Sequence, residues 1–133
     1  MNCFPTFLPA CLLLALLSLG AGCNQTTVEG EGGRMLTLKK PLDQTLIRGK
    51  TNGVRVEIDR RDVLGPVAVE IDQLPAGVQV VGADVEIPRD SESVTVTLHA
   101  DPGAETVRNH RVTVTAKAPP DLAATEVFSI SVR

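Results

Sequence analysis

The sequence predicts an all-β fold, an antiparallel sandwich of two packed sheets with about seven to nine short strands. Apolar and polar residues alternate with a period of two along most of the chain after residue 35, and successive side chains of a strand point to opposite faces. Valine is the dominant apolar residue after residue 23, and the chain has no Trp or Tyr, a composition that favours strands. Gly, Pro and Asp recur at the short intervals expected of turns.

The first 22 residues differ from the rest of the chain. Leu8 to Leu19 is almost entirely apolar, and no charged side chain occurs before Glu29. An apolar run of this length is typical of a signal peptide and is short for a membrane-spanning helix, which needs about 20 apolar residues. Residues 1–22 are therefore predicted to be a signal peptide, which leaves a chain long enough for one domain with a modest core.

The residue that directly follows the predicted signal peptide is Cys23. The chain has three cysteines, Cys3, Cys11 and Cys23, and removal of residues 1–22 would leave Cys23 alone. A lone thiol in an exported domain cannot form an internal disulfide, so it needs another explanation.

The run Leu19-Gly20-Ala21-Gly22-Cys23 resembles the lipobox of bacterial lipoproteins. That resemblance implies cleavage between Gly22 and Cys23, acylation of Cys23 and attachment to a membrane. Two or more acyl chains give stable attachment. Two features depart from the family pattern: Gly20 stands where leucine is usual, and the segment before the apolar run has no Lys or Arg.

Two alternatives to the lipoprotein interpretation remain open, ordinary secretory cleavage near Gly22 and an uncleaved signal anchor. Asn24 follows the cysteine, where lipoproteins retained in an inner membrane usually have aspartate. The resemblance therefore implies a cell-envelope location, in the outer membrane if the cell has one, with a secreted form as the alternative.

Residues 24–34, together with the acylated Cys23, are expected to form a flexible linker. The segment is polar, has three glycines and lacks apolar periodicity, as flexible linkers do. A first edge strand around residues 26–28 is the alternative.

The sandwich is predicted to occupy residues 35–133. Its strands are expected where the alternation is strongest, with shorter runs between them, and clusters of turn residues separate the runs. The expected strands lie around residues 36–38, 45–47, 54–58, 67–71, 78–81, 85–87, 94–98, 112–116 and 128–132.

The region from Leu46 to Arg133 is similar to the immunoglobulin-like sandwich domains of bacterial cell-surface proteins. The similarity depends on the strand at residues 54–60, the Gly65-Pro66-Val67 strand start, the Leu74–Val78 turn and the terminal strand 127–133. The Cys pair and core Trp of antibody domains are absent. The resemblance therefore implies a generic sandwich and leaves the function open.

The densest charge cluster is Asp59-Arg60-Arg61-Asp62, expected in a loop between two strands. Asp59 and Asp62 are weak candidates for calcium ligands, because calcium takes several oxygen ligands; the alternative is a solvated turn. His99 and His110 are the only histidines. They are expected to be exposed, His99 on the polar side of its strand and His110 near a turn, and no metal site is predicted.

No catalytic constellation is apparent, so the chain is not predicted to be an enzyme and no cofactor is expected. A nucleophile elbow is absent, and the scattered acidic residues give no reason to pair any two as catalytic carboxylates.

The net charge of −3 gives no basic surface for nucleic acid. Sugar-binding modules use aromatic platforms, and Phe128, the only aromatic residue after Cys23, is on a core-facing position.

These observations favour a lipid-anchored envelope protein with a structural or protein-binding sandwich and an unidentified envelope protein as partner. An edge strand could accept a strand from that partner. The second interpretation is a secreted ligand-binding domain, with polysaccharide as ligand, and the third is a small envelope enzyme.

Overall fold

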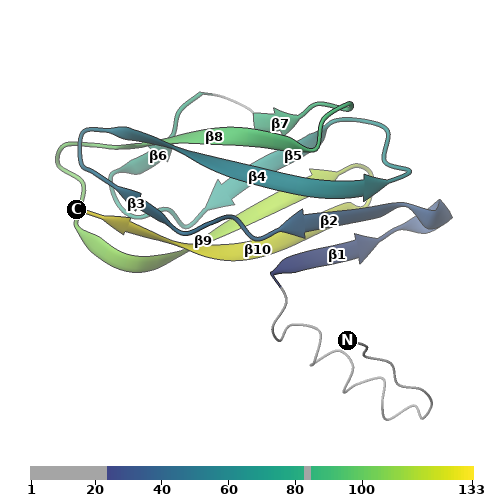
Figure 1. The fold of residues 1–133 in the computed structure, drawn as a ribbon, viewed down its shortest axis with the longest axis horizontal. Coiled ribbons are helices and arrows are strands. Elements are labelled where there is room, and N and C mark those ends of the chain that lie inside the picture. The colour runs from purple at the N-terminus through teal and green to yellow at the C-terminus, as the bar shows by residue number, and fades with distance from the viewer. Residues whose placement is uncertain (1–23, 83–84) are drawn as a thin grey trace, which may run out of the picture.

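The computed structural model describes residues 24–82 and 85–133, and the predicted signal peptide and Cys23 lie outside these ranges. Within them the regular elements are strands apart from one short 3-10 turn, as the all-β prediction requires (Figure 1). No helix in these ranges has the length and apolarity needed to cross a membrane. The elements are β1 (Gln25–Glu29), the 3-10 turn η1 (Glu31–Gly33), β2 (Met35–Lys39), β3 (Gln44–Leu46), β4 (Thr51–Arg61), β5 (Val67–Asp72), β6 (Val78–Val80), β7 (Val85–Ile87), β8 (Ser93–Ala100), β9 (Val107–Ala118) and β10 (Leu122–Val132).

The strands form two five-stranded sheets that pack face to face. One sheet has the order β1-β2-β4-β8-β6 and the other the order β3-β10-β9-β5-β7. Strands β2-β4-β8-β6 follow the A-B-E-D order of an immunoglobulin sandwich, and β10-β9-β5 follow its G-F-C order. The predicted immunoglobulin-like sandwich is therefore confirmed.

The first long segment of the sandwich is divided between the two sheets. β2 pairs antiparallel with β4 in one sheet. After residues 40–43 the chain reaches the other sheet, where β3 pairs with β10 from Gln44↔Ile130 to Leu46↔Val132. This pair is parallel, whereas the sequence suggested only antiparallel pairs, and it protects the last part of β10 from open edge pairing.

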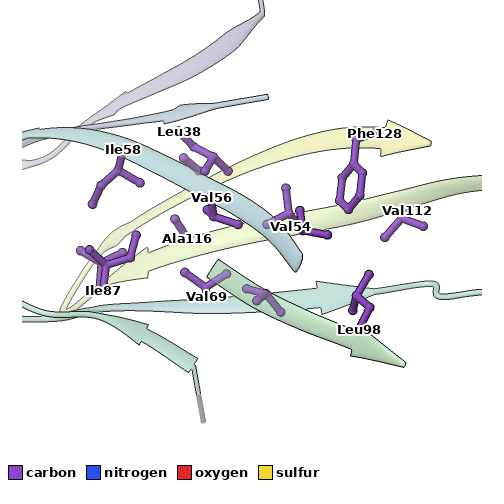
Figure 2. Packing of buried hydrophobic residues seen from close by; sticks show 14 of the residues in the cluster. Leu38, Val54, Val56, Ile58, Val69, Ile87, Leu98, Val112, Ala116 and Phe128 are labelled. Carbon is purple, nitrogen blue, oxygen red and sulfur yellow. The ribbon is translucent and has the colours of Figure 1, made fainter. Parts of the chain in front are cut away.

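The core lies between the sheets and consists of the inward-facing residues of both (Figure 2). The alternation in β4 illustrates the pattern, because Val54, Val56 and Ile58 are buried while Arg55 is exposed. Phe128 in β10 is 1% exposed, as its position in the alternation predicted. Apolar burial of this kind stabilises the sandwich without a disulfide, since residues 24–133 contain no cysteine.

The prediction of a flexible linker over residues 24–34 is wrong. β1 pairs along its whole length with β2, from Gln25↔Lys39 to Glu29↔Met35, and Val28 packs against the core. The glycines that suggested flexibility form the hairpin turn instead, with Gly32 at φ 73° and Gly33 at φ 80°. Backbone with positive φ favours glycine, so these residues serve a defined turn, and β1 brings the strand number to ten.

β9 is also longer than the alternation suggested, because it contains a bulge. Its pairing with β10 shifts between His110↔Ile130 and Val107↔Val132. Asn109 in the bulge has φ 53°, and its N–H donates to Ser131 Oγ at 3.0 Å. Asn is among the few residues that tolerate this backbone conformation. The expected turn near His110 is therefore a bulged stretch of strand.

Candidate interaction surfaces

The charge cluster of residues 59–62 is not a separate loop, which corrects the expectation from the sequence. Its first three residues extend β4, and Asp62 follows the strand with φ 58°. Asp59 Oδ2 lies 3.8 Å from Lys39 Nζ on the outer face of the sheet. Asp62 instead lines a cavity beside Arg34. The two candidate calcium ligands thus have different surroundings.

Arg60 from the same cluster binds backbone and has a structural role that the sequence did not suggest. Its guanidinium donates to the carbonyl oxygens of Gly65 at 2.8 Å, of Pro88 at 2.7 Å and of Ser91. One side chain therefore connects the β4–β5 loop to the β7–β8 turn. Carbonyl oxygens bonded to a charged donor are held more firmly than those bonded to a neutral one.

The two histidines belong to different sheets. His99 in β8 is partly exposed, and its Nε2 lies 3.6 Å from Asp101 Oδ1. His110 in β9 has its Nε2 2.8 Å from the carbonyl oxygen of Gln73. Over residues 24–82 and 85–133, no group of three or more His, Cys, Asp or Glu side chains is placed to hold a metal ion.

One groove lies at the end of the sandwich where β3, β9 and β10 meet. Its volume is about 640 Å³. Arg108 and Arg133 line it together with hydroxyl and amide side chains. Neither arginine side chain has an ion-pair partner among the acidic groups of the described ranges. The groove residues are Thr45, Thr106, Val107, Arg108, Asn109, Ser131, Val132 and Arg133.

A second cavity, of about 490 Å³, lies at the opposite end of the sandwich. The β1–β2 turn contributes Glu31 and Arg34, and the β9–β10 turn contributes Asp121. Arg34 Nη1 lies 2.5 Å from Asp121 Oδ1, and Arg34 Nη2 donates to the carbonyl oxygen of Pro119 at 2.7 Å. Leu64, which is 80% exposed, lines the rim.

A third cavity, of about 350 Å³, adjoins the first described residue, Asn24. Its wall includes Lys40 and Arg111 together with Glu126–Ser129 of β10. The N–H of Lys40 donates to the carbonyl oxygen of Asn24 at 2.8 Å. This cavity is therefore next to the point where the chain leaves the sandwich toward Cys23; Gly22 and Cys23 themselves, the predicted cleavage and lipidation residues, lie outside the described residues.

The outer faces of both sheets are covered by small polar and charged side chains that contact one another. Thr27 Oγ1 lies 2.7 Å from Thr37 Oγ1, and Lys117 Nζ lies 3.1 Å from Glu70 Oε1. The one aromatic side chain of residues 24–133, Phe128, is buried. The described surface therefore has no aromatic side chain on which a sugar ring could stack.

No family model matches the chain, and no curated protein matches it significantly. Three chains of solved structures match. One is a chimeric titin Z1Z2 functionalized with a KLER exogenous peptide from decorin, which is 22% identical, with a TM-score of 0.42. The match covers 74% of this chain and 93% of that chain.

Proposed function

We propose that this chain is an exported envelope protein, acylated on Cys23, whose sandwich is a non-catalytic structural or protein-binding module. The observation that carries the proposal is the position of Cys23. It follows an apolar segment and small residues, and it directly precedes a domain that contains no other cysteine. Acylation explains both why this thiol is alone and why it stands at the start of the folded domain.

Cleavage between Gly22 and Cys23 would make Cys23 the first residue of the mature protein. A lipid-bearing cysteine at this position would hold the domain on a membrane, because several acyl chains bind far more firmly than one. Asn24 in place of aspartate supports an outer-membrane location in a cell with two membranes.

Within this proposal, the partner is an envelope protein that presents acidic side chains to the groove formed by β3, β9 and β10. Arg108 supports this choice, because arginine is enriched at protein interfaces and binds carboxylates in a two-pronged geometry. The hydroxyl groups of Thr45, Thr106 and Ser131 add hydrogen-bonding capacity to the same groove.

Detergent phase partition tests the anchor. We expect wild type and Cys11→Ser to enter the detergent phase, since Cys11 belongs to the segment that is removed, and Cys23→Ser to remain aqueous. An intact mass that begins at residue 23 and carries acyl groups would support the proposal. Partition of wild type into the aqueous phase would contradict it and favour a secreted protein.

Photo-crosslinking in intact envelopes tests the partner. A crosslinking residue at Thr106, in the groove, should capture one protein, and the same residue at Thr97, on the outer face of β8, should not. Substitution Arg108→Glu should abolish the product formed from position 106. Recovery of polysaccharide alone, or equal products from both positions, would contradict a protein partner in the groove.

A further inference from the structure

Asn24, the first described residue, is already part of the sandwich. The carbonyl oxygen of Asn24 accepts a hydrogen bond from Lys40 N–H at 2.8 Å, and Gln25 is paired with Lys39. The side chain of Thr26 then reaches the other sheet, where its Oγ1 lies 3.0 Å from the carbonyl oxygen of Thr125. Asn24 is therefore bonded into the sandwich, and no free segment separates it from Cys23 in the sequence.

This arrangement shortens the distance that a flexible linker would have allowed between the lipid on Cys23 and the domain. One extended residue spans about 3.3–3.6 Å, so a free segment over residues 24–34 would have allowed up to about 40 Å between lipid and domain. With Asn24 fixed on the sandwich, an acylated Cys23 would hold the domain within a few ångströms of its lipid. One surface of the domain must then lie at the membrane.

The surface around Asn24 combines two basic side chains with one exposed leucine. We name it the Asn24 face and define it by Asn24, Lys40, Leu42 and Arg111. Lys40 and Arg111 line the cavity next to Asn24, and neither forms an ion pair with another described residue. Leu42, two residues after Lys40, is 80% exposed.

Two acidic side chains near this face accept hydrogen bonds from uncharged groups of the domain. Glu126, which lines the same cavity, has its Oε2 2.6 Å from Thr26 Oγ1. Asp43 Oδ1 accepts a hydrogen bond from the N–H of Ser129 at 2.9 Å. This contact also holds the chain next to Leu42 against the cavity wall, because Ser129 belongs to that wall.

We propose that the Asn24 face lies against the headgroups of the membrane that holds the lipid anchor. Lys40 and Arg111 contact headgroup phosphates, and Leu42 enters the interface. The attraction is electrostatic and increases with the content of anionic lipid. This orientation rests on the proposed acylation of Cys23, and the experiment below separates failure of the anchor from failure of the orientation.

Two leucines of equal exposure provide a matched test. Leu42 and Leu64 are both 80% exposed, but Leu64 lies in the β4–β5 loop, beyond the Glu29–Met35–Arg61 end of the sheet. Residues 24–133 contain no cysteine, so Leu42→Cys and Leu64→Cys each create one labelling site in the processed protein. The lipidated full-length product, labelled with a fluorophore, is reconstituted in vesicles of phosphatidylcholine and phosphatidylglycerol that contain a headgroup-bound quencher.

We expect quenching at position 42 to exceed quenching at position 64 several-fold. Equal quenching at the two positions, or stronger quenching at position 64, in protein that floats with the vesicles would overturn the orientation and leave the anchor intact. Protein that does not float with the vesicles would overturn the anchor and the orientation with it.

A charge variant tests the electrostatic part of the proposal. Lys40→Gln combined with Arg111→Gln should reduce quenching at position 42 to the level seen in vesicles of phosphatidylcholine alone. Lys50→Gln combined with Arg89→Gln removes the same charge elsewhere and should leave quenching unchanged. Added salt should mimic the first variant, because it screens exposed charges. Quenching that is insensitive to salt, anionic lipid and the first variant would overturn the role of Lys40 and Arg111.

Discussion

Arg34 Nη1 lies 2.5 Å from Asp121 Oδ1, and this pair joins the β1–β2 turn of one sheet to the β9–β10 turn of the other. Arg34 also donates to the carbonyl oxygen of Pro119 at 2.7 Å. With Thr26 placed on β10, the N-terminal hairpin has polar contacts with the opposite sheet at both ends. The hairpin is therefore an integral part of the sandwich.

The first prediction concerns this pair. Arg34→Ala should lower the free energy of unfolding by about 1 kcal/mol, because a charged donor is lost from both a carboxylate and a carbonyl oxygen. Arg55→Ala is the matched control, since Arg55 Nε lies 2.7 Å from Glu57 Oε2 but its side chain is 66% exposed. An exposed pair of this kind contributes about 0.5 kcal/mol or less. Equal shifts of the two variants in urea titrations would contradict the argument.

The second prediction concerns Arg60. Arg60→Met keeps much of the side-chain volume but leaves the carbonyl oxygens of Gly65, Pro88 and Ser91 without their charged donor. We expect a loss of about 2–3 kcal/mol, with faster amide hydrogen exchange in the two loops that Arg60 connects. The neighbouring Arg61→Met, at an exposed position, should change stability by less than about 0.5 kcal/mol. Unchanged exchange in Arg60→Met would show that the bonds do not order the loops.

The third prediction concerns Gly77. Its φ is 87°, and a Cβ atom there would lie 2.7 Å from both Cα and Cβ of Ala104. Gly77→Ala should therefore destabilise the domain by about 3 kcal/mol through backbone strain and overpacking. Gly65→Ala is the control, because its Cβ would meet nothing within 4 Å, and thermal unfolding should show little change. Similar melting temperatures for the two variants would contradict the predicted clash.

The strands of the sandwich could be predicted because their alternation reflects one buried and one exposed face. β4 is an example: Val54, Val56 and Ile58 define it in the sequence and enter the core in the structure. β1 could be predicted only as the alternative edge strand around residues 26–28, because Val28 is its only strongly apolar residue and its pairing with β2 leaves no local pattern. Contacts between distant residues, such as Thr26 with Thr125, leave no local pattern.

The surfaces were harder to predict than the strands. Arg60 and Asp62 are only two residues apart in the sequence. Arg60 donates hydrogen bonds to the backbone of two loops, whereas Asp62 lines a cavity at the end of the sandwich. The groove around Arg108 brings together residues from three strands, and its position depends on the bulge at Asn109. A short-range charge pattern carries no information about such long-range placement.

The composition of the core also has a spectroscopic consequence. Phe128 is the only aromatic ring in residues 24–133, and the full chain has no Trp or Tyr. The near-ultraviolet circular dichroism of a protein of residues 24–133 must then originate from one ring between the two sheets. Methyl resonances shifted by ring currents must likewise belong to its neighbours, including Val112, its partner across the β9–β10 pair. A single fluorinated phenylalanine would report on the packing of the whole interior without any engineered probe.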